Sequence, residues 1–143
     1  MKRIQRTTWL LIVFLVLATA TVALMILDRF QSSIEPRTSD GLHYMSYRGP
    51  GVNDAVAYTG RLDVDSEGCV TFQLFDSGTR YLAAFREGTE VTADGIVTIT
   101  GRRFGFGDTV VVGREYDPSW ETLGRDSLPT CEGEYDMFGM GFD

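Results

Sequence analysis

Residues 69–85 read CVTFQLFDSGTRYLAAF, and this stretch decides the fold class. In residues 69–75, large apolar side chains at the even positions alternate with polar ones. Such alternation indicates a half-buried β-strand, because successive side chains of a strand point to opposite faces. Asp76-Ser77-Gly78 supplies residues that tolerate a left-handed turn, and residues 80–85 then resume an apolar run. The stretch therefore predicts an antiparallel β-hairpin.

Similar short runs flank this hairpin at residues 55–64, 95–101 and 109–116, and residues 65–68 (DSEG) form a turn before it. All 16 glycines follow residue 40 and separate these runs. Short alternating runs with turn residues between them are typical of antiparallel barrels and sandwiches. We predict an all-β fold, a small antiparallel, partly closed barrel of about five to six strands that is OB-like, because closure removes exposed edges.

The N-terminal residues have a different character. Residues 9–27 read WLLIVFLVLATATVALMIL, a run of 19 residues without a charge. As a helix they would extend about 29 Å, which matches the hydrocarbon thickness of a bilayer. A helix on a soluble domain needs a polar face, which this run lacks. The segment predicts one N-terminal transmembrane helix.

Two interpretations of this helix differ in whether it is cleaved. Ala18-Thr19-Ala20 resembles the cleavage site of a signal peptide, and cleavage would give a secreted protein. An uncleaved signal anchor is favoured, because the apolar run continues to Leu27. In both cases the basic residues Lys2, Arg3 and Arg6 stay inside. We therefore expect a single-pass protein of the cell membrane whose C-terminal domain is extracytoplasmic.

The rest of the chain is strongly acidic. The whole protein has a net charge of -7, but residues 28–143 hold all 20 acidic residues and ten arginines, a net charge of -10. Nucleic-acid binding requires clustered positive charge, so this balance argues against a nucleic-acid partner. It argues equally against attachment of the folded part to an anionic membrane surface.

Changes in composition divide the chain into four parts. Residues 1–28 are the signal anchor, and residues 29–54 are a juxtamembrane linker without a sustained period. Residues 55–132 are the β-barrel domain, and residues 133–143 are an acidic, aromatic tail.

Cys69 and Cys131 are the two cysteines of the chain. An even number in an exported domain favours a disulfide over two buried thiols. The pair encloses roughly 63 residues, for which the chain-entropy model gives about 4 kcal/mol of stabilisation.

A wider pattern links these features. Residues 60–70 read GRLDVDSEGCV, followed by GTEV at 88–91, GDTV at 107–110 and the late Cys131. This pattern resembles small exported β-domain proteins of actinobacteria, and residues 95–116 resemble the closing hairpin of OB-like barrels. The resemblance implies the fold and export, and it carries no catalytic residue.

One turn has the composition of a cation site. Asp63, Asp65 and Glu67 place carboxylates at alternate positions before Gly68, as in the opening of an EF-hand loop. Position twelve of that loop is Leu74, where the EF-hand needs a bidentate glutamate. The turn is thus either a β-hairpin turn or a weak Ca²⁺ site.

Two aromatic segments are candidates for partner binding. Phe104 and Phe106 lie in the glycine-rich residues 101–108, where they would contact a ligand or cap the barrel. The tail holds Tyr135, Phe138 and Phe142 among acidic residues, as a docking segment or a final edge strand.

Signals for catalysis are weak. His43 is the only imidazole of the chain, and no Gly-x-Ser-x-Gly motif occurs. We expect a protein that is not an enzyme and needs no cofactor: an interaction or structural module that reaches the membrane through its helix and joins a protein partner in a membrane complex. The alternative is an exported small-ligand or Ca²⁺-binding domain.

Overall fold

The computed structural model of the chain describes residues 2–30, 33–49, 52–116, 131 and 136–142. The chain divides into two compact units, residues 1–31 and 32–143, which are described in turn. The first unit is helical and the second is β-rich, so the fold is mostly β, as predicted.

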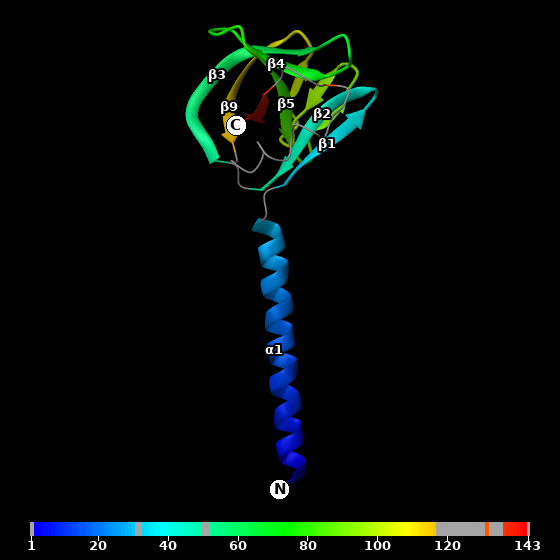
Figure 1. Cartoon of the computed structure of the whole chain (residues 1–143), viewed down its shortest axis with the longest axis vertical. Coiled ribbons are helices and arrows are strands. Elements are labelled where there is room, and N and C mark those ends of the chain that lie inside the picture. The colour runs from blue at the N-terminus through cyan, green and yellow to red at the C-terminus, as the bar shows by residue number, and fades with distance from the viewer. Residues whose placement is uncertain (1, 31–32, 50–51, 117–130, 132–135, 143) are drawn as a thin grey trace. The chain divides into compact units, whose positions relative to one another are not determined.

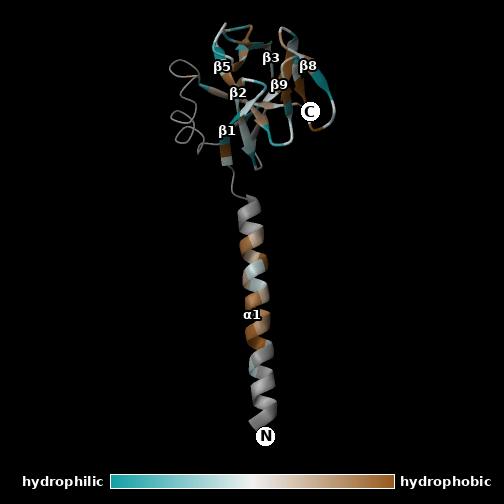
Figure 2. Ribbon diagram, turned by 90° about the vertical axis from the view of Figure 1, so that its right-hand side faces the viewer, coloured by the Kyte–Doolittle hydropathy of each residue, from teal (hydrophilic) through white to brown (hydrophobic). Residues whose placement is uncertain are grey.

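Helix α1 comprises Lys2–Phe30. Ten large apolar side chains of α1 are exposed by 46–74%, and their distribution is visible in Figure 2. The hydroxyl groups of Thr19 and Thr21 donate to backbone carbonyls three and four residues earlier, so these polar groups are satisfied within the helix. The sequence predicts a transmembrane span here, but among the described residues no helix is both long and apolar enough to cross a membrane.

The second unit consists of strands β1 to β10 (Figure 1). Their bounds are β1 Ser33–Ser39, β2 Leu42–Arg48, β3 Val52–Val64, β4 Val70–Leu74, β5 Arg80–Arg86, β6 Glu90–Thr92, β7 Gly95–Val97, β8 Arg103–Gly105, β9 Thr109–Tyr116 and β10 Met137–Gly141. The strands expected at 55–64, 69–75, 80–85 and 109–116 correspond to β3, β4, β5 and β9.

Five of these strands close into a ring of hydrogen-bonded neighbours, in the order β5, β10, β9, β3, β4 and back to β5. The prediction that all pairings are antiparallel is wrong, because β10 and β2 both pair with β5 in parallel. Strand β2 is separated from β5 by the β3–β4 hairpin, and such long connections allow parallel pairing.

Strand β3 pairs with β4 along one edge and with β9 along the other, and it is strongly curved (Figure 1). Its residue Gly60 pairs with Leu74 of β4 on one edge and with Val110 of β9 on the other. A Cβ at Gly60 would collide with the carbonyl oxygen of Gln73 and with the ring of Phe72. Glycine is therefore required at this close approach.

Residues 29–54 are not simply a linker. Of the residues described within this range, 29 and 30 end α1 and most of the others form β1, β2 and the start of β3, with Asp40-Gly41 between β1 and β2. Both turn residues have positive φ, 52° at Asp40 and 77° at Gly41, as a type I′ hairpin turn requires. The β1–β2 hairpin extends from the ring through the pairing of β2 with β5.

The inner core fills the ring. Alternate residues of the ring strands point inward, and the small sheet β6-β7-β8 adds Val91 and Ile96 to this core. The strand expected over 95–101 ends at Val97, and β8 forms within the glycine-rich residues 101–108. The small sheet therefore covers part of the inner core.

A second, outer cluster lies on the opposite face of β2 and β5. Cys69 and Cys131 form the predicted disulfide in this cluster, with a Cα–Cα distance of 5.9 Å. Both are buried, together with Ile34, Met45, Tyr47, Leu82 and Ala84. Through this disulfide, residue 131 is covalently linked to the residue just before β4.

The expected tail, residues 133–143, contains β10. This strand is one of the five strands of the ring, where it pairs with β5 in parallel and with β9 in antiparallel orientation. Phe138 and Met140 point into the inner core. The end of the described chain is thus part of the domain and not a separate segment.

Candidate functional site

Two of the phenylalanines predicted for partner binding, Phe104 and Phe142, come together at the inner core. Phe104 of β8 stacks on Phe142, which follows β10, with ring centroids 5.0 Å apart and planes at 26°. Phe142 in turn lies 6.5 Å from the ring of Phe85. Phe104, Phe106 and Phe142 are all partly buried and pack against the inner core. We refer to these three residues as the aromatic patch.

Local backbone features hold the aromatic patch in place. Gly95 of β7 has a φ of 148°, and a Cβ there would collide with the carbonyl oxygen of Phe104. Gly95 pairs directly with Gly105, so β7 and β8 approach closely at this point. The Asp108 carboxylate accepts a hydrogen bond from the Gly105 amide at 2.7 Å and closes the following turn.

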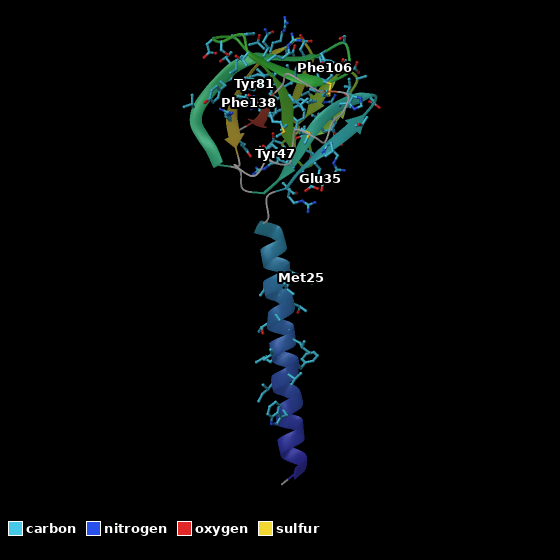
Figure 3. All side chains as sticks on the ribbon, viewed as in Figure 1. Met25, Glu35, Tyr47, Tyr81, Phe106 and Phe138 are labelled. Atoms are coloured by element: carbon cyan, nitrogen blue, oxygen red, sulfur yellow. A yellow bond between two sulfur atoms is a disulfide. The ribbon has the colours of Figure 1, made fainter. Side chains whose placement is uncertain are left out.

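The amide of Gly107 donates to the carbonyl of Leu62 at 2.7 Å, and the amide of Leu62 donates to the carbonyl of Asp108 at 3.2 Å. These bonds fix the β8–β9 turn on β3. The side chain of Phe106, labelled in Figure 3, is therefore carried by a turn that is attached to the ring.

One cation lies beside the patch. The guanidinium carbon of Arg102 is 5.2 Å from the ring centroid of Phe104, in the range of a cation–π interaction. The aromatic patch thus combines partly exposed phenylalanine side chains with an adjacent positive charge. Its three side chains carry no ionisable group, so this arrangement is suited to contact and not to proton transfer.

Phe138 is placed differently from the other predicted contact residues. Its side chain is 1% exposed and lies at the centre of an aromatic cluster (Figure 3). The neighbours of its ring are Phe72 at 5.0 Å, Tyr58 and Tyr81 at 5.4 Å, and the Arg114 guanidinium at 5.5 Å. In this structure Phe138 is a core residue. Tyr135 lies outside the described residues.

Two of the three carboxylates of the proposed cation turn, those of Asp63 and Asp65, have partners within the protein. Asp65 Oδ1 accepts hydrogen bonds from the amides of Glu67, at 2.9 Å, and Cys69, at 2.8 Å. Asp63 Oδ2 lies 3.2 Å from Arg61 Nη2. Among the described residues, no group of three or more His, Cys, Asp or Glu side chains is arranged to hold a metal ion.

His43 lies on β2, where its Nδ1 is 3.0 Å from Thr38 Oγ1 of β1. The adjacent Tyr44 points into the inner core, 5.8 Å from the ring of Phe85. Burial raises the pKa of Tyr44 above its ordinary value of 10.0, and the positive charge of Arg37 offsets part of this rise. The contacts of His43 with Thr38 and of Tyr44 with Phe85 are therefore structural contacts of the β1–β2 hairpin.

The exposed, outward side of β9 was not predicted from the sequence. Val111 is 59% exposed, whereas its neighbours Val110 and Val112 are buried. The signal was present in the run TVVV, because alternation in a strand requires one of three successive valines to face outward.

Comparison of the chain with protein-family models, curated proteins and solved structures gave no match.

Proposed function

We propose that this protein is a membrane-anchored, extracytoplasmic interaction module without enzymatic activity. Helix α1 is the anchor, the strand ring is a small OB-like barrel, and the aromatic patch is the contact surface for a protein partner in a membrane complex. The observation that carries this proposal is the stacking of Phe104 on Phe142, which brings two distant segments together at a partly exposed site.

The anchor is supported by the sequence and by exposure. Residues 9–27 carry no charge, and the large apolar side chains described within α1 are exposed. Exposed apolar side chains of this kind are unfavourable in water and favourable in lipid. The basic residues before it and the disulfide in the β-rich unit both support an extracytoplasmic domain.

The role of the aromatic patch is supported by its composition. Aromatic residues and arginine are enriched at the energetic centres of protein interfaces. Phe104, Phe106 and Phe142 are held by a turn bonded to β3 and by the strand β10, so little conformational entropy is lost when they are covered.

The anchor is tested on membranes of cells that produce the full chain. We expect the protein to stay in the pellet after an alkaline carbonate wash and to have the intact mass of residues 1–143. Release into the wash, or the mass of a chain that begins after Ala20 and comprises residues 21–143, would show a secreted domain.

The contact surface is tested by affinity capture of the full chain in mild detergent. Phe104→Leu keeps an apolar side chain but removes the stacking on Phe142, and Phe142→Leu does the same from the other side. The matched control is Val56→Leu, since Val56 is 56% exposed on β3. We expect a partner that is lost with both phenylalanine variants and kept with the control. A partner kept equally by all three variants would exclude the patch.

A further inference from the structure

Glu115 of β9 is a buried acidic residue. It is 8% exposed, and its Oε2 atom is buried without a hydrogen-bond partner among the residues that the structure describes. Burial of a carboxylate without a hydrogen bond is costly, so an orphaned group of this kind requires a physical explanation. A bound group that donates hydrogen bonds to Oε2 would supply it.

The carboxylate lies on a part of the sheet that has almost no side chains. The inner-core side chains of β10 point to one face of the sheet, so its two glycines, Gly139 and Gly141, lie on the opposite face. Gly139 pairs with Ala84 of β5, which belongs to the outer cluster, and Gly141 pairs with Gly113 of β9. No side chain larger than a methyl group extends from these four positions. We call Ala84, Gly113, Gly139 and Gly141 the glycine floor.

Two side chains border the glycine floor. Glu115 extends over it from β9, because a Cβ built at Gly141 would be 3.2 Å from Glu115 Oε1 and 3.4 Å from its Cγ. On the β5 side, the hydroxyl group of Tyr47 reaches the backbone carbonyl of Met140 at 3.3 Å. A ligand on the floor would therefore have a carboxylate on one side and a tyrosine on the other.

The charge of Glu115 decides the class of ligand. A buried carboxylate is best satisfied by a cation with N–H groups, because charge-assisted hydrogen bonds are stronger than neutral ones. Residues 28–143 have a net charge of -10, which attracts cations to this unit. The donor set does not favour a metal ion, since the described residues hold no group of three or more His, Cys, Asp or Glu suited to one. Because Glu115 is only 8% exposed, the approaching group must be slender.

We propose that Glu115 and the glycine floor bind the end of a small organic cation, an ammonium or guanidinium group. The cation donates a hydrogen bond to Glu115 Oε2, and its end lies on the backbone of β10, where a larger side chain would block it. The aromatic patch packs against the inner core on the other face of the sheet. The inference is therefore independent of the partner proposed for that patch.

The test measures the melting temperature of the purified full chain in detergent with ethylguanidinium, ethylammonium or ethylurea. Ethylurea has nearly the shape of ethylguanidinium but no charge. Glu115→Gln removes the charge of the site and keeps the length of the side chain. The matched control is Glu87→Gln, which removes the charge of an exposed carboxylate that is paired with Arg48.

We expect both cations to raise the melting temperature of the unchanged and the Glu87→Gln chains by a few degrees, because a ligand that binds only the folded chain stabilises it. Ethylurea should cause no rise, and neither cation should cause one in Glu115→Gln, measured from that variant's own ligand-free value. Gly141→Ala should weaken binding several-fold, because its Cβ would crowd the carboxylate. Phe104→Leu should leave the rise unchanged, which separates this site from the aromatic patch.

An equal rise with ethylurea, an equal rise in Glu115→Gln, or no rise with either cation in the unchanged chain would overturn the proposal. A blocked pentapeptide with a central arginine distinguishes a free cation from a protein side chain. Weaker binding of the peptide than of ethylguanidinium would support a small ligand. Tighter binding of the peptide would overturn this part of the proposal.

Discussion

The hydroxyl group of Tyr47 donates a hydrogen bond to the backbone carbonyl of Met140 over 3.3 Å, across 93 positions of sequence. Tyr47 is on β2 and Met140 on β10, and β5 lies between these strands. Because Tyr47 is 1% exposed, the bond is sheltered from water. It connects the β1–β2 hairpin to the ring independently of the β2–β5 pairing.

Tyr47→Phe removes this hydrogen bond and keeps the ring. We expect the free energy of unfolding to fall by about 1 kcal/mol, the typical net value of a buried hydrogen bond. Urea denaturation measures the change, with Tyr81→Phe as a control in which the altered hydroxyl is on a half-buried residue. An unchanged midpoint for Tyr47→Phe would show that the bond adds nothing to stability.

Phe138 should be the most sensitive core position of β10, because its ring contacts three other aromatic rings and an arginine. Phe138→Ala should cost about 3–5 kcal/mol, and Phe138→Leu distinctly less. Phe75→Leu is the control: it alters a 55% exposed side chain, and we expect a change within about 0.5 kcal/mol. Equal stabilities of the alanine variant and the control would contradict the core assignment.

Removing the disulfide by replacing both Cys69 and Cys131 with alanine should lower the free energy of unfolding by up to about 4 kcal/mol. The reason is that the bond restricts an unfolded chain over a sequence separation of 62. Thermal melts with and without reductant check the effect. The double variant should be insensitive to reductant, and a reductant effect that persists in it would have another cause.

Stability in acid should depend on one exposed ion pair. Hydrogen bonds from Arg48, both 2.7 Å long, lower the pKa of Glu87 below its ordinary value of 4.5. The carboxylate therefore stabilises the fold above the ordinary pKa, and this contribution is lost as the pH falls through the lowered pKa. Arg48→Gln should flatten the dependence of melting temperature on pH as the pH falls below the ordinary value of 4.5. The difference in melting temperature between the two proteins should be small and should shrink in high salt, because the ion pair is exposed. Parallel pH profiles of the two proteins would contradict a contribution of this pair to stability.

The Asp65 turn can be separated from a cation site by one substitution. Asp65→Ala deprives two backbone amides of their acceptor, and we expect a loss of about 1 kcal/mol, similar to the loss of a helix cap. The loss should be the same in Ca²⁺ and in chelator. A melting temperature that rises with Ca²⁺ in the unchanged protein, and no longer rises in Asp65→Asn, would instead support the Ca²⁺-binding alternative.

The sequence predicted those elements whose two faces differ. In β9 the valines alternate between core and surface, and in β4 the large apolar side chains fall at alternate positions, although Thr71 between them is buried as well. The period and the turn residues were therefore sufficient to predict both strands. Strand β2 was assigned to a linker because it contributes to both clusters: Tyr44 packs in the inner core, and Met45 and Tyr47 pack in the outer cluster. A strand covered on both sides shows no alternation. The Asp40-Gly41 dipeptide was the available signal for its hairpin.

The aromatic patch was predicted by residue type but not by position. Phe104 and Phe142 meet because β10 enters the ring between β5 and β9, and such non-local pairing has no local signature. The same insertion explains why Phe138 is in the core. The run MFGMG of β10 contains two glycines and gives little indication of a strand by itself.

The place of β10 in the ring also sets the timing of folding. While residues 137–141 are still being synthesised or exported, β5 and β9 each lack a neighbour and the inner core lacks Phe138 and Met140. The ring can close only after nearly all of the described chain has emerged. Until β10 has paired, a nascent chain of this protein has unpaired strand edges that favour aggregation. A chain that lacks β10 would keep these edges and would be a substrate for quality-control proteases.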